Sequence, residues 1–551
     1  MVVSTANQLS STYKLWKRFT FPSENGPRDA VAVPTSVGNQ LNSSYALIID
    51  MALAHIFTIL FSVMLYFYMR RRQMEVTRLS PLAPTIWNKR SDLMDLIVET
   101  VTSSKDNWKS PGILLLLFVF FAFWVGEKAT GTLVPPLIII DYAAPVNPEA
   151  IYVPDRSNDN NVASAALFPL EVPRALRALG STVDSELRQK VNVSAARPMG
   201  QTDDGADIIR IDYSYRATGA DFGLQKYPSL TLDVAGSCVT DYEWFIGTRI
   251  TDSDGSKIAV DIYGVFANDT DQWTASLFDG RQPIATFFSG NSTGGALPFS
   301  NATWGAIVSS VNRTSFSPGT DPWYLTGPGN SDTGASYSVM PGRPALSCWE
   351  DDVWSYGGHN STIQALTSEA LPGLDLSDSL QSVLLSTLGN PMIQTVGQHL
   401  QASALLSSTT ASDQVFDASV SSVHGDLERL VQAAYVATVN CLTDLTLYPA
   451  GSDKTVPNIA LGDSGQILDG VADFVVWSPD VTALSTLVII VVPSVFVGAW
   501  VVAAVLMYWT PVKAVTVLDS NDLQRKLKSN EATDVVEGWV DAVLAGSAGN
   551  Q

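Results

Sequence analysis

Three long apolar runs mark the chain, at 46–69, 108–134 and 484–509. A helix rises about 1.5 Å per residue, so about 20 residues cross a hydrocarbon core roughly 30 Å thick. Each run meets that length. In the second run, Glu127 and Lys128 interrupt the apolar residues, and we place them near one membrane interface. The pattern predicts three transmembrane helices, which makes the lipid bilayer a partner of the chain.

Shorter segments connect and flank these runs. Residues 1–45 are predicted to form a disordered N-terminal tail. Residues 70–107 are predicted to form a basic loop, in which the apolar spacing from Leu93 to Val101 favours an amphipathic helix. Residues 510–551 follow the last run as a second tail.

The segment 141–480 carries two different periodicities. In IIRIDYSYR (208–216), apolar and aromatic residues alternate with polar ones, which is typical of a strand with one buried face. From about 361 to 446 the apolar spacing becomes helical, as in the stripe from Val420 to Leu445. We therefore predict an α+β exterior domain, with a β-rich first part and a helical second part, carried on the three transmembrane helices.

Basic residues predict the orientation, because cytosolic loops of membrane proteins are enriched in Lys and Arg. The loop from Arg70 to Lys109 holds eight basic residues, and the tail after the third run holds four. Both are expected in the cytosol, with 141–480 extracellular or lumenal. Basic residues between Lys14 and Arg28 favour a cytosolic N-terminus instead, which would leave only two of the three runs as spans.

Glycosylation sequons support the same exterior assignment. Six Asn-x-Ser/Thr sequences lie within 141–480, and the predicted cytosolic segments contain none. A seventh, at Asn42, lies close to the first run. We predict an integral membrane glycoprotein of the plasma membrane or the secretory pathway, with N-glycans at Asn192, Asn268, Asn291, Asn301, Asn312 and Asn360.

The net charge of −21 belongs to the predicted exterior domain. Residues 141–480 contain 39 acidic and 16 basic residues, a net charge of −23. This acidic balance argues against a nucleic-acid partner, whose binding surface would be basic. The 46% of hydrophobic residues excludes a disordered acidic chain. The acidic surface is interpreted either as a source of solubility or as an attraction for cations and basic partners.

The three cysteines of the chain, Cys238, Cys348 and Cys441, all lie in the predicted exterior domain. They allow three different single disulfides, each of which leaves one thiol free. Cys441 lies on the apolar helical stripe, where a buried free thiol is expected. We therefore predict a disulfide between Cys238 and Cys348.

Two stretches resemble catalytic sequences without their full machinery. Gly462–Gly465 reads GDSG, as in the nucleophile loop of trypsin-like proteases, but no histidine in 141–480 lies in the sequence context of its base. Glu350 and Asp352 would share one face of a strand, and paired carboxylates beside tryptophans are what a glycosidase cleft needs. No metal-binding spacing or phosphate-binding loop occurs. The sequence predicts no catalytic, cofactor-binding or metal-binding residue and no cofactor.

Two ionisable residues, Asp50 and His55, lie at the start of the first apolar run. Ionisable groups inside a membrane are functional candidates by default. With Pro493 inside the third run, they leave open a role as an accessory subunit of a channel or transporter.

Three stretches have a distinctive sequence, namely SCWEDDVWSYGGH (347–359), STLGNPMIQTVGQHL (386–400) and FDASVSSVHGDLERLVQAAYVATVNCLTDLTLY (416–448). In these stretches the chain resembles a large group of uncharacterised integral membrane proteins of filamentous ascomycete fungi. The resemblance covers most of 45–510 and implies the same layout of spans and a glycosylated exterior domain. It implies no activity.

We expect a non-enzymatic membrane glycoprotein that acts in recognition, adhesion or sensing. The ligand of its exterior domain would be an unidentified protein or glycan. The main alternative is an ectoenzyme acting on cell-wall carbohydrate, which Glu350 and Asp352 would serve.

Overall fold

The structure, a computed structural model, describes residues 11–72, 111–155, 161–203, 205–253, 256–268, 272–275, 283–290, 300–311, 313–329, 336–410, 415–447, 456–462 and 464–508. The chain forms two compact units. The large unit comprises Met1–Leu15, Phe19–Arg28 and Ala144–Trp477. The small unit comprises Trp16–Arg18, Asp29–Ala143 and Ser478–Gln551.

The small unit contains a sheet in which β21 (Val481–Ser485) lies between β2 (Arg28–Pro34) and β3 (Ile139–Asp141). Both neighbours pair with β21 in antiparallel fashion, and Ala30 and Ala32 of β2 are fully buried. The stretch predicted as a disordered tail, 1–45, therefore includes two strands, β1 (Arg18–Phe21) and β2, and the first turns of a helix. Its order comes from β21, a partner strand that lies near the other end of the chain.

Two long helices leave neighbouring strands of this sheet. Helix α2 (Thr35–Arg72) follows β2 directly, and α12 (Thr486–Met507) follows β21 directly. The Ser485 side chain caps α12 by accepting a hydrogen bond from the N–H of Val488. Over the described residues, these are the two helices long and apolar enough to cross a membrane, with candidate spans at Thr35–Leu60 and Thr486–Leu506.

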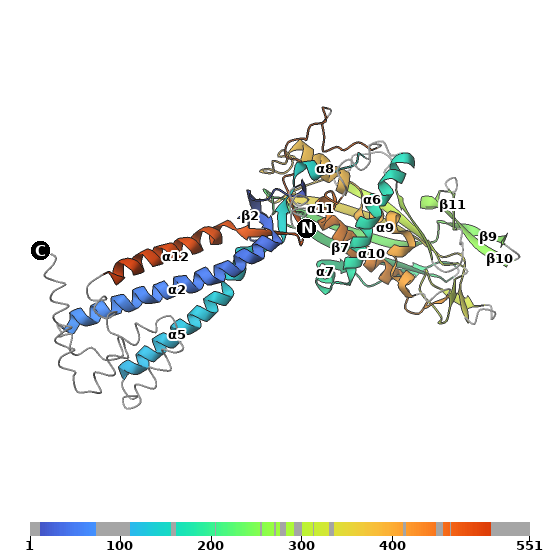
Figure 1. The fold of residues 1–551 in the computed structure, drawn as a ribbon. Helices are drawn as coiled ribbons and strands as arrows, with labels where there is room; N and C mark the ends of the chain where they lie inside the picture. The colour runs from blue at the N-terminus through green and yellow to red at the C-terminus, as the bar shows by residue number, and fades with distance from the viewer. Residues whose placement is uncertain are drawn as a thin grey trace. The chain divides into compact units, whose positions relative to one another are not determined.

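Helices α2 and α12 run parallel. Gly38 of α2 lies against Thr482, whose Cβ would be only 3.0 Å from a methyl group added at Gly38. Further along, the Tyr45 hydroxyl donates to the carbonyl oxygen of Ile489 at 2.9 Å, and the rings of His55 and Phe496 lie 5.9 Å apart. The contacts advance in the same direction along both helices, as Figure 1 also shows.

The prediction of three transmembrane helices is wrong for the described part of the chain, where two helices qualify. The second apolar run does form a helix, α5 (Pro111–Leu133), but Glu127 and Lys128 break its apolar sequence. Its end at Gly131 lies beside Asp50 of α2. The 3-10 helix η2 (Pro135–Ile138) then leads into β3.

The large unit is organised around an antiparallel sheet of eight strands. Six of them follow the order β12-β13-β17-β8-β7-β5, while β18 pairs with β17 and β6 pairs with β7. Their bounds are β5 (Val191–Val193), β6 (Arg197–Gln201), β7 (Asp207–Thr218), β8 (Thr231–Asp241), β12 (Ile284–Ser289), β13 (Ser300–Ser309), β17 (Ala345–Tyr356) and β18 (His359–Ser361).

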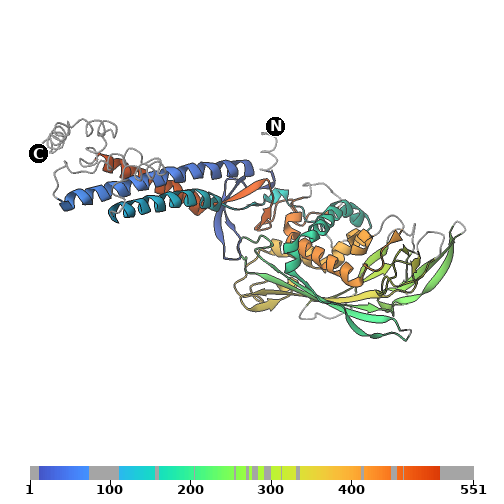
Figure 2. The same cartoon turned by 90° about the horizontal axis from the view of Figure 1, so that it is seen from below.

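One face of this sheet, here termed the inner face, packs against helices. Helices α6 (Asn161–Gly180), α9 (Met392–Leu400) and α10 (Val423–Val439) pack on one another and cover it, as Figures 1 and 2 show. The alternation in IIRIDYSYR is as predicted, because Ile211, Tyr213 and Tyr215 are buried on this face.

The prediction of a β-rich first part and a helical second part is wrong. Helix α6 precedes all strands of the eight-stranded sheet, and β17 lies between helices α6 and α9 in sequence. The helices need each other and the sheet to bury their apolar sides, so strands and helices mix along the chain. The long stripe predicted from Val420 to Leu445 is also broken at Asn440, after which the short helix α11 (Cys441–Asp444) begins.

Smaller elements complete the fold. The strands are β1 (Arg18–Phe21), β4 (Ala143–Pro145), β9 (Phe245–Ser253), β10 (Ser256–Gly264), β11 (Gln272–Thr274), β14 (Thr314–Ser315), β15 (Thr326–Pro328), β16 (Tyr337–Val339), β19 (Val415–Phe416) and β20 (Val475–Trp477). The helices are α7 (Ser185–Lys190) and α8 (Asp378–Leu388), and the 3-10 helices are η3 (Pro148–Ala150), η4 (Ser181–Val183), η5 (Val265–Ala267), η7 (Ile363–Ala365), η8 (Gln401–Ala404) and η9 (Leu406–Thr410).

The opposite face of the eight-stranded sheet, here termed the outer face, carries an apolar cluster at one end among the described residues. This cluster contains Trp244, Tyr263, Ile307 and Ala345. The Trp244 ring lies over Gly305 of β13, where an added Cβ would meet it at 2.4 Å. Strands β9, β10 and β11 form the sheet that carries Tyr263 and half-buried Trp273 of this cluster.

Candidate functional site

The acidic sequence of β17 divides between the two faces of the sheet. Glu350 points to the inner face and is 1% exposed, whereas Trp349 points to the outer face and is 44% exposed. The Tyr213 hydroxyl donates to Glu350 Oε2 at 2.6 Å, and Trp304 Nε1 donates to the Tyr213 hydroxyl at 3.2 Å. Glu350 therefore belongs to a buried chain of hydrogen bonds.

A glycine makes this chain of hydrogen bonds possible. In register, Gly236 of β8 pairs with Tyr213 on one side and with Glu350 on the other. A Cβ at Gly236 would lie 2.1 Å from Tyr213 Cζ. The Tyr213 ring therefore crosses over Gly236 to reach the carboxyl group two strands away.

Desolvation raises the pKa values of the two carboxyl groups on the inner face of β17, those of Glu350 and Asp352. Desolvation raises the pKa of Glu350 well above its usual range, and the neighbouring Asp352 raises it further. Desolvation, with the charge of Asp351, raises the pKa of Asp352 to about 7. A glycosidase acid must reach the glycosidic oxygen. Buried Glu350 does not reach the surface, so the predicted pairing on one face does not form a catalytic cleft.

Sequence analysis missed a second buried acidic group. Asp426 of α10 accepts hydrogen bonds from the Tyr324 hydroxyl at 2.5 Å and from the N–H of Ser407 at 2.8 Å. Desolvation raises the pKa of Asp426 to about 6 and that of Asp321 to about 7. The only available signal was an aspartate within the apolar stripe of α10.

The guanidinium group of Arg313 lies near this acidic group. Arg313 is fully buried, and its guanidinium carbon lies 4.0 Å from the centre of the Phe416 ring. Its Nη1 donates to Ser310 Oγ at 3.1 Å. Desolvation lowers the pKa of Arg313 to about 10.

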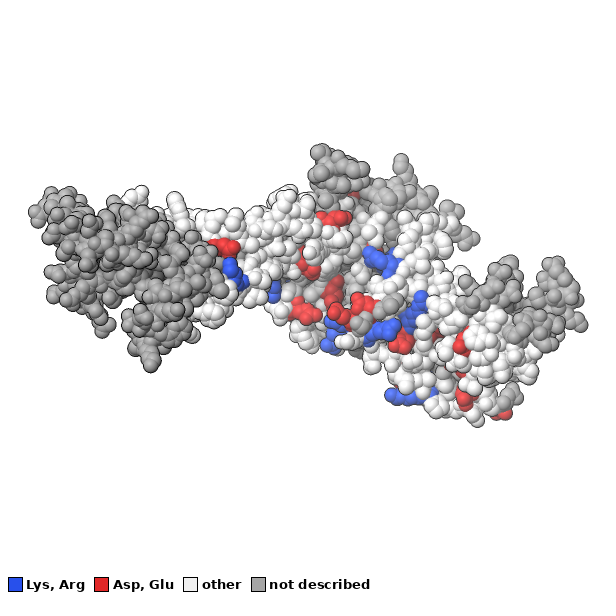
Figure 3. Space-filling view, turned by 60° about the horizontal axis from the view of Figure 1, so that its bottom comes forward, with Lys and Arg blue, Asp and Glu red and all other residues white. Residues whose placement is uncertain are grey.

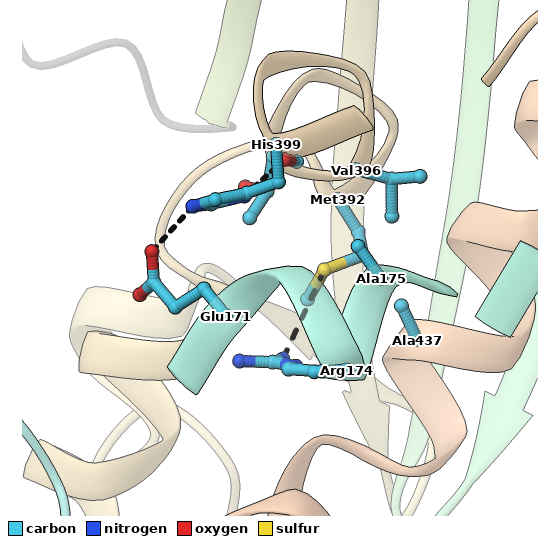
Figure 4. Close-up of a pocket in the computed structure, with 8 residues that line it drawn as sticks. Glu171, Arg174, Ala175, Met392, Val396, His399 and Ala437 are labelled. Atoms are coloured by element: carbon cyan, nitrogen blue, oxygen red, sulfur yellow. Dashed lines mark hydrogen bonds and ion pairs between the residues drawn. The ribbon is translucent and has the colours of Figure 1, made fainter. Parts of the chain in front are cut away.

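A small pocket lies between α6, α9 and α10 (Figure 4). Glu171 of α6 pairs with His399 Nε2 of α9, and Arg174 Nη2 lies 4.0 Å from the sulfur of Met392. The pocket offers about 10 Å³ to a water-sized sphere, which is room for one water molecule at most. It is too small for a substrate.

The same region of α6 carries a buried ion pair. Arg174 Nε lies 2.9 Å from Asp444 Oδ2, and Arg177 pairs with the other carboxyl oxygen. Desolvation raises the pKa of Asp444 to about 6, although both arginines act in the opposite direction. The two ion pairs tie α6 to α11.

Trp349 on the outer face has only small or polar neighbours in register. Ser237 of β8 and Thr303 of β13 lie directly opposite it on the two flanking strands. Ser347 and Asp351 follow on the same face of β17 and are half-buried. The register neighbours that the structure describes are therefore too small to cover the Trp349 ring, in keeping with its exposure.

A family model for a domain of unknown function (DUF8406) matches residues 172–476, which is more than half of the chain. The chain belongs to the DUF8406 family. Comparison with curated proteins and with solved structures finds no match in either set.

The DUF8406 region contains the whole eight-stranded sheet together with α8, α9 and α10. It also contains all six predicted glycosylation sites. Asn192, Asn268 and Asn360 are exposed, and Asn301 pairs in register with Asp351. Asn291 and Asn312 lie outside the described residues.

The three cysteines of the DUF8406 region lie on three different elements, β8, β17 and α11. Cys238 and Cys348 are opposite each other on β8 and β17, with a Cα–Cα distance of 4.1 Å, and form a disulfide. Cys441 is buried and free.

The other sequence candidates do not form active sites. Within the GDSG sequence, the N–H of Gly465 donates to the carbonyl oxygen of Gly462 at 2.8 Å, a backbone contact typical of a turn, and Asp463 lies outside the described residues. In the part of the chain that the structure describes, no group of three or more His, Cys, Asp or Glu side chains could hold a metal ion. The predicted amphipathic helix within 70–107 and the tail at 510–551 lie outside that part.

The surface charges of the large unit are mixed. Figure 3 shows acidic and basic side chains side by side in the middle of one face. On this face the acidic excess does not form a single uniform patch, so it does not by itself define a site for cations.

Proposed function

We propose that the chain is a membrane-anchored recognition protein that holds its DUF8406 domain on the exterior side of a plasma or secretory membrane. It would serve in recognition, adhesion or sensing, as expected from its resemblance to fungal membrane glycoproteins. The observation that carries the proposal is the parallel pair α2 and α12, which leave neighbouring strands of one sheet.

Because the two helices are parallel, their C-terminal ends lie on the same side of a membrane. Basic residues after either helix therefore indicate the cytosolic side for both. Arg70–Arg72 end α2, and the first charged residue after α12 is Lys513. Basic residues favour the cytosolic side of a membrane. The two helices therefore favour the exterior side for β2 and β21. Because β3 lies in the same sheet, this placement requires the chain to return across the membrane between Arg72 and β3, and α5 is the described helix that leads into β3.

The sequons agree with that orientation. Asn192 lies in β5 and Asn360 in β18, two strands of the eight-stranded sheet, and both side chains are exposed. Asn42, by contrast, lies inside α2, and its Oδ1 atom is buried. We expect glycans at the first two positions and none at Asn42.

Burial of the acidic groups favours recognition over catalysis. Glu350 and Asp426, two of the buried carboxyl groups of the domain, both accept tyrosine hydrogen bonds within the core. They stabilise a particular packing of sheet and helices, and neither contacts the surface. The exposed feature of the same strand is Trp349.

Protease protection tests the exterior placement. Sealed microsomes carrying the full-length chain with a C-terminal epitope tag would be treated with protease. The account predicts that the tag is digested while the DUF8406 domain survives until detergent opens the vesicles. Digestion of the domain in sealed vesicles, whose cytosolic face is turned outward, would overturn the proposal.

A further inference from the structure

Trp349 lies in a row of residues that crosses the outer face of the eight-stranded sheet. In register, the row runs from Asp212 through Ser237 and Trp349 to Thr303. Neighbouring strands in a sheet are about 4.8 Å apart, so the row spans roughly 14 Å. Within the row, Ser237 is buried, Asp212 is half-buried, and Trp349 and Thr303 are exposed.

The surroundings of Trp349 leave its ring accessible. Ser237 and Thr303 are too short to cover an indole, and Ala235, one diagonal step away, is also small and exposed. The apolar cluster on this face ends at Gly305, under the ring of Trp244. Trp349 stands just beyond that cluster, on the open part of the face.

Two aspartates on this face, Asp212 and Asp233, are paired with arginines. Arg210 Nε lies 2.8 Å from Asp212 Oδ1, and Arg197 Nη1 lies 4.0 Å from Asp212 Oδ2. Arg216 Nε lies 2.5 Å from Asp233 Oδ1. Beside these pairs the face presents the carboxylate of Asp351, whose negative charge next to Trp349 disfavours a polyanion.

We infer that the outer face around Trp349 binds a neutral oligosaccharide. The axial C–H groups of a sugar ring would stack on the indole, because an aromatic ring offers a large, rigid apolar surface. Thr303, Ser347 and the carboxylate of Asp351 surround it with hydrogen-bonding groups for the hydroxyls. The inference rests on the proposed exterior function and specifies the class of its ligand.

A protein partner fits this face less well. Stable protein interfaces have a core of several clustered apolar side chains surrounded by a polar rim. Trp349 is a single aromatic side chain among hydroxyl groups, carboxylates and alanine. A sugar needs only this combination of one stacking surface and nearby polar groups.

Calorimetric titration tests the inference on the full-length protein in nanodiscs, after enzymatic removal of its own N-glycans. The probes are laminarihexaose and chitohexaose, which are neutral, and hexagalacturonic acid, which is charged. We expect binding of at least one neutral probe and at least about tenfold weaker binding of the acid. Trp349→Ala should raise the Kd of the neutral probe at least about tenfold, which corresponds to about 1.4 kcal/mol.

Two variants serve as controls. Trp349→Phe keeps an aromatic surface and should retain intermediate affinity. Phe316→Ala removes another exposed aromatic ring of the large unit, which is 58% exposed, and should leave the affinity unchanged. The inference is overturned if neither neutral probe binds, if Trp349→Ala binds as tightly as the parent, or if the acidic probe binds equally well. Failure here leaves the microsome result intact, so the two proposals fail separately.

Discussion

The hydroxyl group of Tyr213 reaches across Gly236 to donate a 2.6 Å hydrogen bond to Glu350. Three neighbouring strands thus share one buried polar contact. Trp304 Nε1 extends the contact to a fourth strand, β13. A polar network of this kind favours one register of the sheet, since a shift of one residue would leave its members without partners.

Gly236→Ala should destabilise the protein by about 2–4 kcal/mol, because the new Cβ forces the Tyr213 ring away and leaves Glu350 without its donor. Denaturant unfolding followed by tryptophan fluorescence measures the loss. Gly247→Ala is the matched control, since Gly247 lies in strand β9 with no atom within 4 Å of an added Cβ. Equal stability of the two variants would contradict the role of Gly236.

The protein should be more stable at pH 4–5 than at pH 7–8. Desolvation raises the pKa of Asp352 and Asp321 to about 7 and of Asp426 to about 6, whereas unfolded aspartate titrates near 3.9. The folded chain therefore binds protons more tightly. This stabilisation is complete below the unfolded pKa and is lost as the pH rises to about 7.

Thermal unfolding across pH 4–8 measures this dependence. Asp352→Asn should flatten it, by stabilising the protein at pH 7.5 relative to the parent and not at pH 4. Asp233→Asn, which changes a half-exposed carboxylate paired with Arg216, should leave the slope nearly unchanged. An unfolding temperature that rises steadily from pH 4 to pH 7 would contradict the burial of these groups.

Asp444→Asn should destabilise the protein by about 3–5 kcal/mol, because it leaves the guanidinium group of Arg174 buried without its carboxylate. The side chain of Arg174 is 7% exposed. Arg177→Ala should lose less than about 1 kcal/mol, since the Arg177 side chain is 37% exposed. Chemical denaturation compares the two, and similar losses would contradict the difference in burial.

Replacing Cys238 and Cys348 together with serine should lower the stability by about 2–5 kcal/mol, because the disulfide closes a loop of 110 residues. On gels, the parent protein should migrate differently with and without reductant, and the double variant should not. Cys441→Ala should behave like the parent on these gels. If the gel mobility of the parent protein were the same with and without reductant, the disulfide between Cys238 and Cys348 would be refuted.

Local patterns in the sequence predicted the elements whose partners lie nearby. The alternation around Tyr213 indicates a strand with one buried face, and the sharing of a face by Glu350 and Asp352 follows from strand geometry. The burial of Glu350 could not be predicted, because it depends on how the helices α6, α9 and α10 cover the sheet. The need for glycine at position 236 likewise could not be predicted, because it depends on Tyr213 and Glu350 pairing with Gly236 from the two flanking strands.

Long-range pairing defeated other predictions. The tail at 1–45 contains β2, which is ordered by β21 at the other end of the chain. The prediction of a helical second part was wrong because strands and helices alternate along the sequence, although they pack as separate layers. The buried contacts of Arg313 and Asp426 join β-turn and helix residues that no periodicity links.

Stepwise loss of glycans tests the central claim of an exterior DUF8406 domain most directly. The full-length chain would be expressed in a fungal or other eukaryotic host and analysed with and without endoglycosidase. The account predicts a mobility shift that shrinks with Asn192→Gln, shrinks again when Asn360→Gln is added, and is unaffected by Asn42→Gln. A parent chain with no shift at all, made in a host that glycosylates its other secretory proteins, would contradict the claim.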